Sequence, residues 1–218
     1  MPAKHAIKEY APGAYYHIYN RGVEKRTVFE DVSDYKTFLS YLRLYLTDPH
    51  LPGESRQARA PSHPLNNYTG NISLLAYCLM PNHFHLLVRQ VEADGINYFM
   101  RSLTSEYVRY FNKKYKRVGS LFQGPYKAVI VTNETQWYYL TKYIHRNPLS
   151  LPTFRESPDR LSEYPYSSYP NYLQRFQQSW VQTQEVLGHF HDDTSRYKKF
   201  VEDRDELTPI YNIAIDTD

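Results

Sequence analysis

The chain has 218 residues, of which 41% are hydrophobic and 16% aromatic, so it has enough apolar side chains to bury a core and is not disordered. It carries 26 Lys and Arg against 23 Asp and Glu, a net charge of +3 that is too small to identify a polyanionic partner. The single cysteine, Cys78, excludes an intramolecular disulfide and a thiolate metal cluster. No segment is apolar enough for a membrane helix or a secretory signal, so we expect a cytoplasmic protein.

The first part of the chain predicts a strand, a helix and a loop. β-forming residues over 14–19 predict the strand. Apolar residues at three- and four-residue spacing over 35–46 predict the helix, which Ser33 or Asp34 would cap. Residues 47–70 show no periodicity and contain several Pro and Gly, which is typical of a mobile loop.

A hairpin is predicted next. Strands are expected over 72–80 and 83–90, because both are rich in β-forming residues and the intervening Pro81-Asn82 favours a turn. Apolar residues at helical spacing then predict a helix over 96–115. Strand character returns over 120–131.

A third long helix follows this last strand. Asn133-Glu-Thr-Gln136 resembles a capping box that begins the helix, and Pro148 ends it. The order β, α, β, β, α, β, α predicts an antiparallel α+β sheet with helices on one face. The proline- and tyrosine-rich stretch 149–176 predicts an extended wrap, and short helices are expected over 180–187 and 194–202.

Two histidines on the strand expected over 83–90 form the first candidate site. His83 and His85 project to the same face of a strand, while Phe84 points into the opposite layer. Two imidazoles on a buried face need a partner, for which a divalent metal is one candidate and hydrogen bonds are the other. The same tripeptide at 189–191 follows a glycine and precedes two aspartates, so we expect exposed, unpaired rings there.

The third long helix carries a candidate nucleophile. Tyr139, Tyr143 and Asn147 lie on one stripe of this helix. If the stripe faces the histidines, the amide oxygen of Asn147 can complete a site for Mg²⁺ or Mn²⁺. Tyr143 would then attack a phosphate, provided that a nearby cation or base lowers its pKa from about 10. Core packing is the alternative role for these tyrosines.

A basic, aromatic segment is the candidate nucleic-acid interface. Glu106 is the only acidic residue between 101 and 117, which concentrates positive charge as phosphate tracking requires. The glycines and aromatic rings that follow can let a nucleic-acid strand approach and stack. A solvated helix face is the alternative. The candidate DNA-binding residues are Arg101, Arg109, Lys113, Lys114, Lys116, Arg117, Phe122, Tyr126 and Lys127.

Four motifs follow one another in the chain: Met80-Pro-Asn-His-Phe-His-Leu-Leu87, Tyr107-Val-Arg-Tyr-Phe-Asn112, Ser120-Leu-Phe-Gln-Gly124 and Tyr143-Ile-His-Arg-Asn-Pro148. Together they resemble the REP-associated tyrosine transposases, which belong to the single-tyrosine HUH transposases. With flanking segments the resemblance covers about residues 14–170. It implies a ferredoxin-like sheet in a catalytic core of residues 1–148, followed by an extension of residues 149–218.

The resemblance also implies an activity. His83, His85 and Asn147 would hold Mg²⁺ or Mn²⁺, and Tyr143 would attack a DNA phosphodiester to give a 5′-phosphotyrosine link and a free 3′-OH. The implied partner is single-stranded DNA with hairpins of palindromic repeats. The protein would be associated with the nucleoid, would act as a monomer or homodimer, and would not bind membranes. Many relatives carry glutamine at the position of Asn147, whose side chain is shorter.

Two other functions are compatible with the sequence. One is a catalytically silent protein that binds hairpin DNA through the basic helix alone. The other is a metal-dependent phosphoesterase in which water attacks the phosphate and no covalent adduct forms.

Overall fold

Four strands form one antiparallel sheet in the computed structural model, which describes residues 10–48, 66–203 and 210. The strands are β1 (Tyr15–Arg21), β2 (Ile72–Met80), β3 (His83–Gln90) and β4 (Lys127–Val131). Their order in the sheet is β2-β3-β1-β4, so β3 and β1 are central. Each neighbouring pair is antiparallel, which confirms the predicted α+β sheet.

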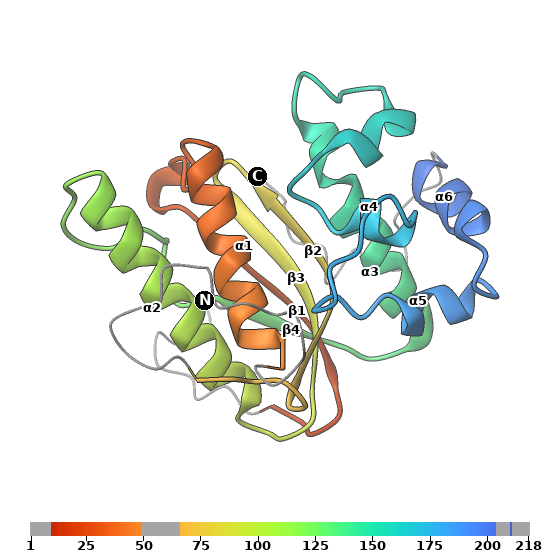
Figure 1. Ribbon diagram of the computed structural model, residues 1–218, viewed down its shortest axis with the longest axis horizontal. Helices are drawn as coiled ribbons and strands as arrows, with labels where there is room; N and C mark the ends of the chain where they lie inside the picture. The colour runs from red at the N-terminus through yellow and green to blue at the C-terminus, as the bar shows by residue number, and fades with distance from the viewer. Residues whose placement is uncertain (1–9, 49–65, 204–209, 211–218) are drawn as a thin grey trace.

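Helices cover both faces of this sheet (Figure 1). The three long helices are α1 (Val32–Leu46), α2 (Gly95–Lys114) and α3 (Glu134–Arg146). α1 and α2 lie on one face, and α3 lies on the other with the C-terminal helices. The predicted element order is confirmed, but the expectation of helices on one face was wrong, because α3 buries its apolar side against the second face. None of the described helices is long and apolar enough to cross a membrane.

Side chains alternate between the two faces along the central strand β3. Phe84 and Leu86 join the core beneath α1 and α2. Leu87 joins the separate core beneath α3. His83 and His85 share the face of Leu87, so both imidazoles point toward α3.

The cap of α1 differs from the prediction. Its N-cap residue is Asp31, whose carboxylate accepts hydrogen bonds from the backbone N–H groups of Ser33 and Asp34. The Asp34 carboxylate accepts in return from the N–H of Asp31, which completes a capping box. The expected cap at Ser33 or Asp34 was wrong, because both residues already lie in the first turn of the helix.

The last strand is shorter than the one expected over 120–131. Lys127–Val131 pairs with β1, whereas residues 120–126 form bends with an isolated bridge between Gly22 and Phe122. Pro125 interrupts pairing because it has no N–H to donate to a ladder. Most of the loop expected over 47–70 lies outside the described residues.

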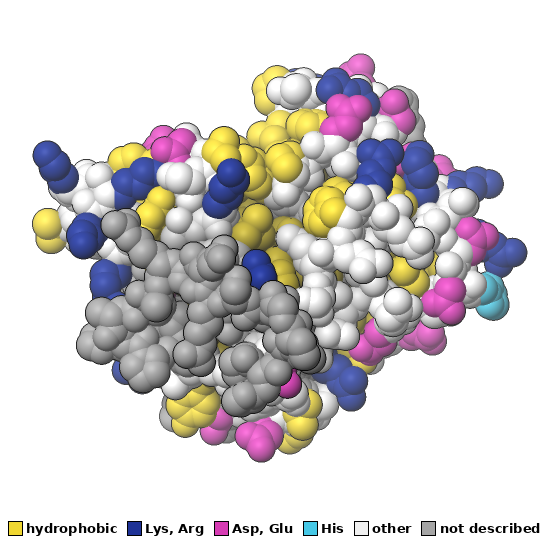
Figure 2. Space-filling model, viewed as in Figure 1, with side chains coloured by type: hydrophobic (Ala, Val, Ile, Leu, Met, Phe, Trp, Pro, Cys, Tyr) yellow, Lys and Arg dark blue, Asp and Glu magenta, His cyan; other side chains and the backbone are white. Residues whose placement is uncertain are grey.

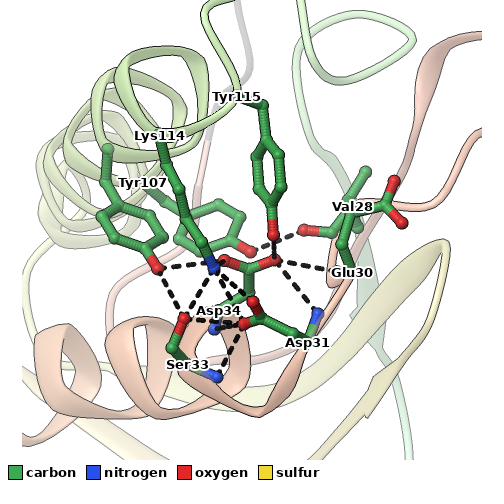
Figure 3. A network of polar contacts seen from close by, with 9 residues as sticks. Val28, Glu30, Asp31, Ser33, Asp34, Tyr107, Lys114 and Tyr115 are labelled. Atoms are coloured by element: carbon green, nitrogen blue, oxygen red, sulfur yellow. Dashed lines mark hydrogen bonds and ion pairs between the residues drawn. The ribbon is translucent and has the colours of Figure 1, made fainter.

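A polar network ties the C-terminal end of α2 to the start of α1 (Figure 3). The Lys114 ammonium lies 2.8 Å from Asp31 Oδ1 and 2.7 Å from Asp34 Oδ1, and it also donates to Ser33 Oγ. The Asp34 side chain is fully buried and accepts a further hydrogen bond of 2.8 Å from the Tyr115 hydroxyl. Hydrogen bonding to the Lys114 ammonium holds the pKa of Asp31 well below its usual range. This network therefore fixes the two helices against each other.

We expect Lys114→Met to destabilise the fold by about 2 kcal/mol, because it leaves the buried Asp34 carboxylate without its cation. Partial exposure of the ammonium keeps the effect below that of a fully buried ion pair. Urea unfolding measures the change. Lys113→Met is the matched control and should stay within about 0.5 kcal/mol of the wild type; equal stability of the two variants would contradict a structural role for the network.

The chain after α3 forms short helices rather than a purely extended wrap. Helical turns occur within the stretch 149–176, and the helix expected over 180–187 begins only at Gln184. The helix expected over 194–202 is confirmed. The remaining elements are η1 (Val23–Lys25), η2 (Asn147–Ser150), η3 (Pro158–Glu163), α4 (Tyr169–Tyr172), α5 (Gln184–His189) and α6 (Thr194–Glu202).

This C-terminal extension lies along the outer edge of β2. The N–H of Leu79 donates to the carbonyl of Tyr166 at 2.9 Å, and the N–H of Gln182 donates to the carbonyl of Leu74 at 2.8 Å. These hydrogen bonds use backbone groups that an edge strand otherwise leaves open for pairing. The extension therefore covers that edge of the sheet.

A buried polar contact joins α3 to the extension. His145 Nε2 lies 2.8 Å from Ser168 Oγ, and His145 Nδ1 lies 2.8 Å from the hydroxyl of Tyr197 in α6. Burial lowers the pKa of His145 to about 3. The folded protein therefore keeps this imidazole neutral at physiological pH.

Stability should fall on acidification through this histidine. Between pH 6.5 and 3 the unfolded chain binds a proton at His145 that the folded chain does not, so the free energy of unfolding decreases as the pH falls through this window. The contribution is about 2 kcal/mol between pH 7 and pH 5. Urea unfolding at both values should show a smaller pH dependence in His145→Gln than in the wild type. Equal pH dependence in the two proteins would show that His145 does not contribute.

Candidate catalytic site

His83 and His85 form the centre of the candidate site, on the face of the sheet that α3 covers. Their ring centroids lie 4.9 Å apart with the planes at 88°. His85 is fully buried, and 9% of the His83 surface is exposed. The strand prediction therefore placed the two imidazoles correctly on one face.

Asn82 and Asn147 contact opposite nitrogens of His83. His83 Nδ1 lies 2.6 Å from Asn82 Oδ1, and His83 Nε2 lies 3.4 Å from Asn147 Oδ1. Each asparagine is oriented by its amide nitrogen, since Asn82 donates to the carbonyl of Lys25 and Asn147 donates to that of Tyr143. An amide oxygen only accepts hydrogen bonds, so in a neutral His83 ring the shorter contact, to Asn82, favours the proton on Nδ1 and leaves a lone pair on Nε2. Two lone pairs, on His83 Nε2 and Asn147 Oδ1, thus face each other.

This arrangement of donors fits a divalent cation. Two acceptors 3.4 Å apart repel unless a cation or a shared proton lies between them. Imidazole nitrogen and amide oxygen are ligands that Mn²⁺ accepts, and Mg²⁺ would complete the same set with water. Among the described residues no group of three or more His, Cys, Asp or Glu side chains gathers to hold a metal. The donor atoms available here to such a cation belong to His83, His85 and Asn147.

Tyr143 lies against these histidines in the same chain. Its ring centroid is 5.4 Å from that of His85 with the planes at 84°. Tyr139, one turn earlier on α3, packs edge-on against Phe200 at 5.3 Å. Of the stripe noted in the sequence, Tyr143 and Asn147 thus reach the histidines, while Tyr139 contacts the C-terminal extension.

His17 is a component of this site that the sequence analysis missed. It is fully buried on β1, and its Nε2 lies 2.8 Å from His85 Nδ1. Its ring centroid is also 5.8 Å from that of Tyr143. Alternation along β1 would have put His17 on one face of its strand, but only the pairing with β3 reveals that this is the face of His85.

Lys127 lies at the edge of the same site. It is the pairing partner of Tyr19 on β1, and its ammonium lies 5.5 Å from the centre of the Tyr19 ring. The Tyr19 ring in turn stacks 6.0 Å from His85. This candidate DNA-binding residue is therefore placed on the side of the sheet that carries the histidines.

A groove of 720 Å³ runs between α2 and residues 120–126, on the opposite face of the sheet from the histidines. Arg101, Arg109, Phe122 and Tyr126 line it, so four candidate DNA-binding residues share one surface. Only 6% of the Phe122 surface is exposed, because its ring packs edge-on in the core. Phe122 therefore shapes the wall of the groove and offers little surface for stacking on a base.

The remaining basic candidates lie at the C-terminal end of α2. Figure 2 shows Lys and Arg side chains gathered over this part of the molecule. Lys113 and Lys116 are exposed there, and the Arg117 guanidinium lies 5.8 Å from the centre of the Phe111 ring. The Lys114 ammonium already pairs with two carboxylates. Lys113 and Lys116 thus carry more uncompensated positive charge than Lys114 at this end.

The second histidine tripeptide, at 189–191, lies beside the first half of α3. His189 Nδ1 lies 3.1 Å from Glu134 Oε1, and the His189 ring stacks on that of Tyr138 with centroids 4.3 Å apart. The expectation of an unpaired ring was therefore wrong for His189. His191 is exposed as expected.

Comparisons with known proteins give two findings. Residues 66–147 match the family model described as "Transposase IS200 like". The fold is similar to a solved structure described as "Structure of the REP associates tyrosine transposase bound to a REP hairpin", with a TM-score of 0.53 and 12% sequence identity, over 82% of this chain and 96% of that one. The chain matches no curated protein. The family match spans β2, β3, α2, β4 and α3, and so includes every candidate site residue except His17.

Proposed function

We propose that this chain, which carries an IS200-like transposase domain over residues 66–147, nicks and rejoins single-stranded DNA beside hairpins of palindromic repeats. The observation that carries the proposal is the convergence of the Tyr143 ring with His85 at 5.4 Å and of Asn147 with His83 at 3.4 Å. A phenol beside two imidazoles and an amide oxygen suits attack on a phosphodiester. The fold similarity to a hairpin-bound transposase supports the same class of substrate.

Tyr143 is the nucleophile in this proposal. Its phenolic oxygen forms a bond to phosphorus while the bond from phosphorus to the 3′-oxygen breaks. The phenol loses its proton, and the leaving 3′-oxygen gains one. The 5′ end stays attached to the protein as a phosphotyrosine ester, so a 3′-OH from another strand can reverse the step without ATP.

His83, His85 and Asn147 would hold a divalent cation beside this tyrosine. Such a cation supplies Lewis-acid stabilisation of the charge that develops on the phosphate oxygens. The protein itself supplies the positions of the groups, because β3 fixes the two imidazoles, α3 fixes Tyr143, and Asn147 follows directly after α3, one turn from Tyr143.

The groove along α2 is the proposed hairpin-binding surface. Arg101 and Arg109 line it and Lys113 lies beyond it on the same helix, so positive charge follows one path along α2. The Arg109 guanidinium also lies 2.7 Å from Glu106, in an exposed ion pair that solvent screens. Lys116, Arg117 and Lys127 remain proposed phosphate contacts outside the groove.

We expect Tyr143→Phe to abolish a covalent protein–DNA adduct formed with labelled hairpin DNA and Mn²⁺, and to reduce nicking by about 10³-fold or more. Denaturing electrophoresis detects the adduct. Tyr139→Phe is the matched control and should retain it, because Tyr139 packs against Phe200. Nicking that survives in Tyr143→Phe without an adduct would indicate a phosphoesterase. Tight binding without nicking or an adduct in the wild type would indicate a silent hairpin-binding protein.

The groove predicts a change in the salt dependence of DNA binding. Each lost phosphate contact should flatten the slope of log K against log salt by about 0.7–0.9, so Arg101→Ala combined with Lys113→Ala should flatten it by about twice that amount. Binding titrations at several salt concentrations measure the slope. Arg196→Ala on α6, on the other side of the sheet, should leave it unchanged. An unchanged slope in the double variant would place the DNA on a different surface.

A further inference from the structure

We propose that His17 is a positioning residue, which holds His85 in the tautomer that presents Nε2 to the proposed metal. This inference rests on the proposed function. His17 Nε2 lies 2.8 Å from His85 Nδ1, and both side chains are fully buried. A metal bound by His85 would therefore be bound through its other nitrogen, Nε2.

The position of the proton on the His85 ring decides whether Nε2 can bind a metal. A neutral imidazole carries a single N–H, and only one of the two facing nitrogens can donate in the hydrogen bond between His17 and His85. His85 can offer a lone pair on Nε2 only if its proton is on Nδ1. His17 must then accept through Nε2 and carry its own proton on Nδ1.

His83 shows the same arrangement. Its Nδ1 contacts Asn82 Oδ1 at 2.6 Å, which leaves the lone pair on Nε2, beside Asn147. Thus each of the two histidines has a separate residue in contact with Nδ1. Metal-binding histidines commonly have such a partner, and its loss typically weakens metal affinity 10–100-fold.

The strands hold the His17 ring in place. β1 pairs with β3 on one side and with β4 on the other, so the backbone at His17 is fixed within the sheet. The His17 and His85 rings are nearly parallel, with centroids 5.1 Å apart and planes at 20°. Tyr143 packs edge-on against the His17 ring at 5.8 Å. His17 thus contacts both His85, a proposed metal ligand, and Tyr143, the proposed nucleophile.

The tautomer can be measured directly in the unaltered, metal-free protein. Long-range ¹H–¹⁵N NMR correlations of the assigned His85 ring distinguish a protonated Nδ1 from a protonated Nε2. We expect protonation at Nδ1 of His85. Protonation at Nε2 would overturn the proposal, and this measurement needs no variant to fold.

Variants of His17 test the consequence for metal binding. Glutamine can accept a hydrogen bond from His85 Nδ1 through its amide oxygen, whereas phenylalanine fills similar space and cannot. We expect His17→Phe to bind Mn²⁺ 10–100-fold more weakly than the wild type in electron paramagnetic resonance titrations without DNA. His17→Gln should recover most of this loss. Equal affinity of His17→Phe and the wild type, or equal losses in both variants, would overturn the proposal.

His83→Ala separates this inference from the proposed function. If His83→Ala loses Mn²⁺ and the wild type forms the Tyr143 adduct, while His17→Phe binds Mn²⁺ normally, then only the inference about His17 fails. If the wild type neither binds Mn²⁺ nor forms an adduct, the proposed function fails, and the role of His17 fails with it.

Discussion

The pairing of β1 with β3 is the constraint on which the candidate site depends. It sets Tyr19 opposite His85, so every second side chain of both central strands enters the layer beneath α3. His17 and His85 therefore meet inside the fold, although 68 positions separate them in the chain. α3, which covers this face of the sheet, then places Tyr143 beside His85. The same alternation sends Phe84 into the opposite core, so the strand that carries the polar rings is also anchored by apolar packing.

The sequence was sufficient for features that depend on local spacing. Alternation within one strand put His83 and His85 on one face, and helical spacing put Tyr143 and Asn147 on one stripe. His17 was not found, because the pairing register of two strands is not encoded in either strand alone. The faces covered by the helices were also mispredicted, since the packing of α3 depends on the C-terminal extension as well as on its own pattern.

The distribution of uncompensated charge was predicted least well from the sequence. The run of basic residues near the end of α2 indicates a uniform positive surface, yet the Lys114 ammonium is held by Asp31 and Asp34 from α1. Those partners lie about 80 positions away in the chain. Lys114 on this helix is thus held in ion pairs, whereas the neighbouring Lys113 faces solvent. Only the tertiary contacts distinguish the two residues.

The covered edge of β2 affects how copies of this molecule can associate. The extension hydrogen-bonds to that edge through Tyr166 and Gln182, whereas no described strand pairs with the outer side of β4. A sheet with two open edges can add neighbours without limit and grow into a fibre. By occupying backbone groups of β2, the extension removes one of the two edges at which this sheet could pair with a strand of another molecule.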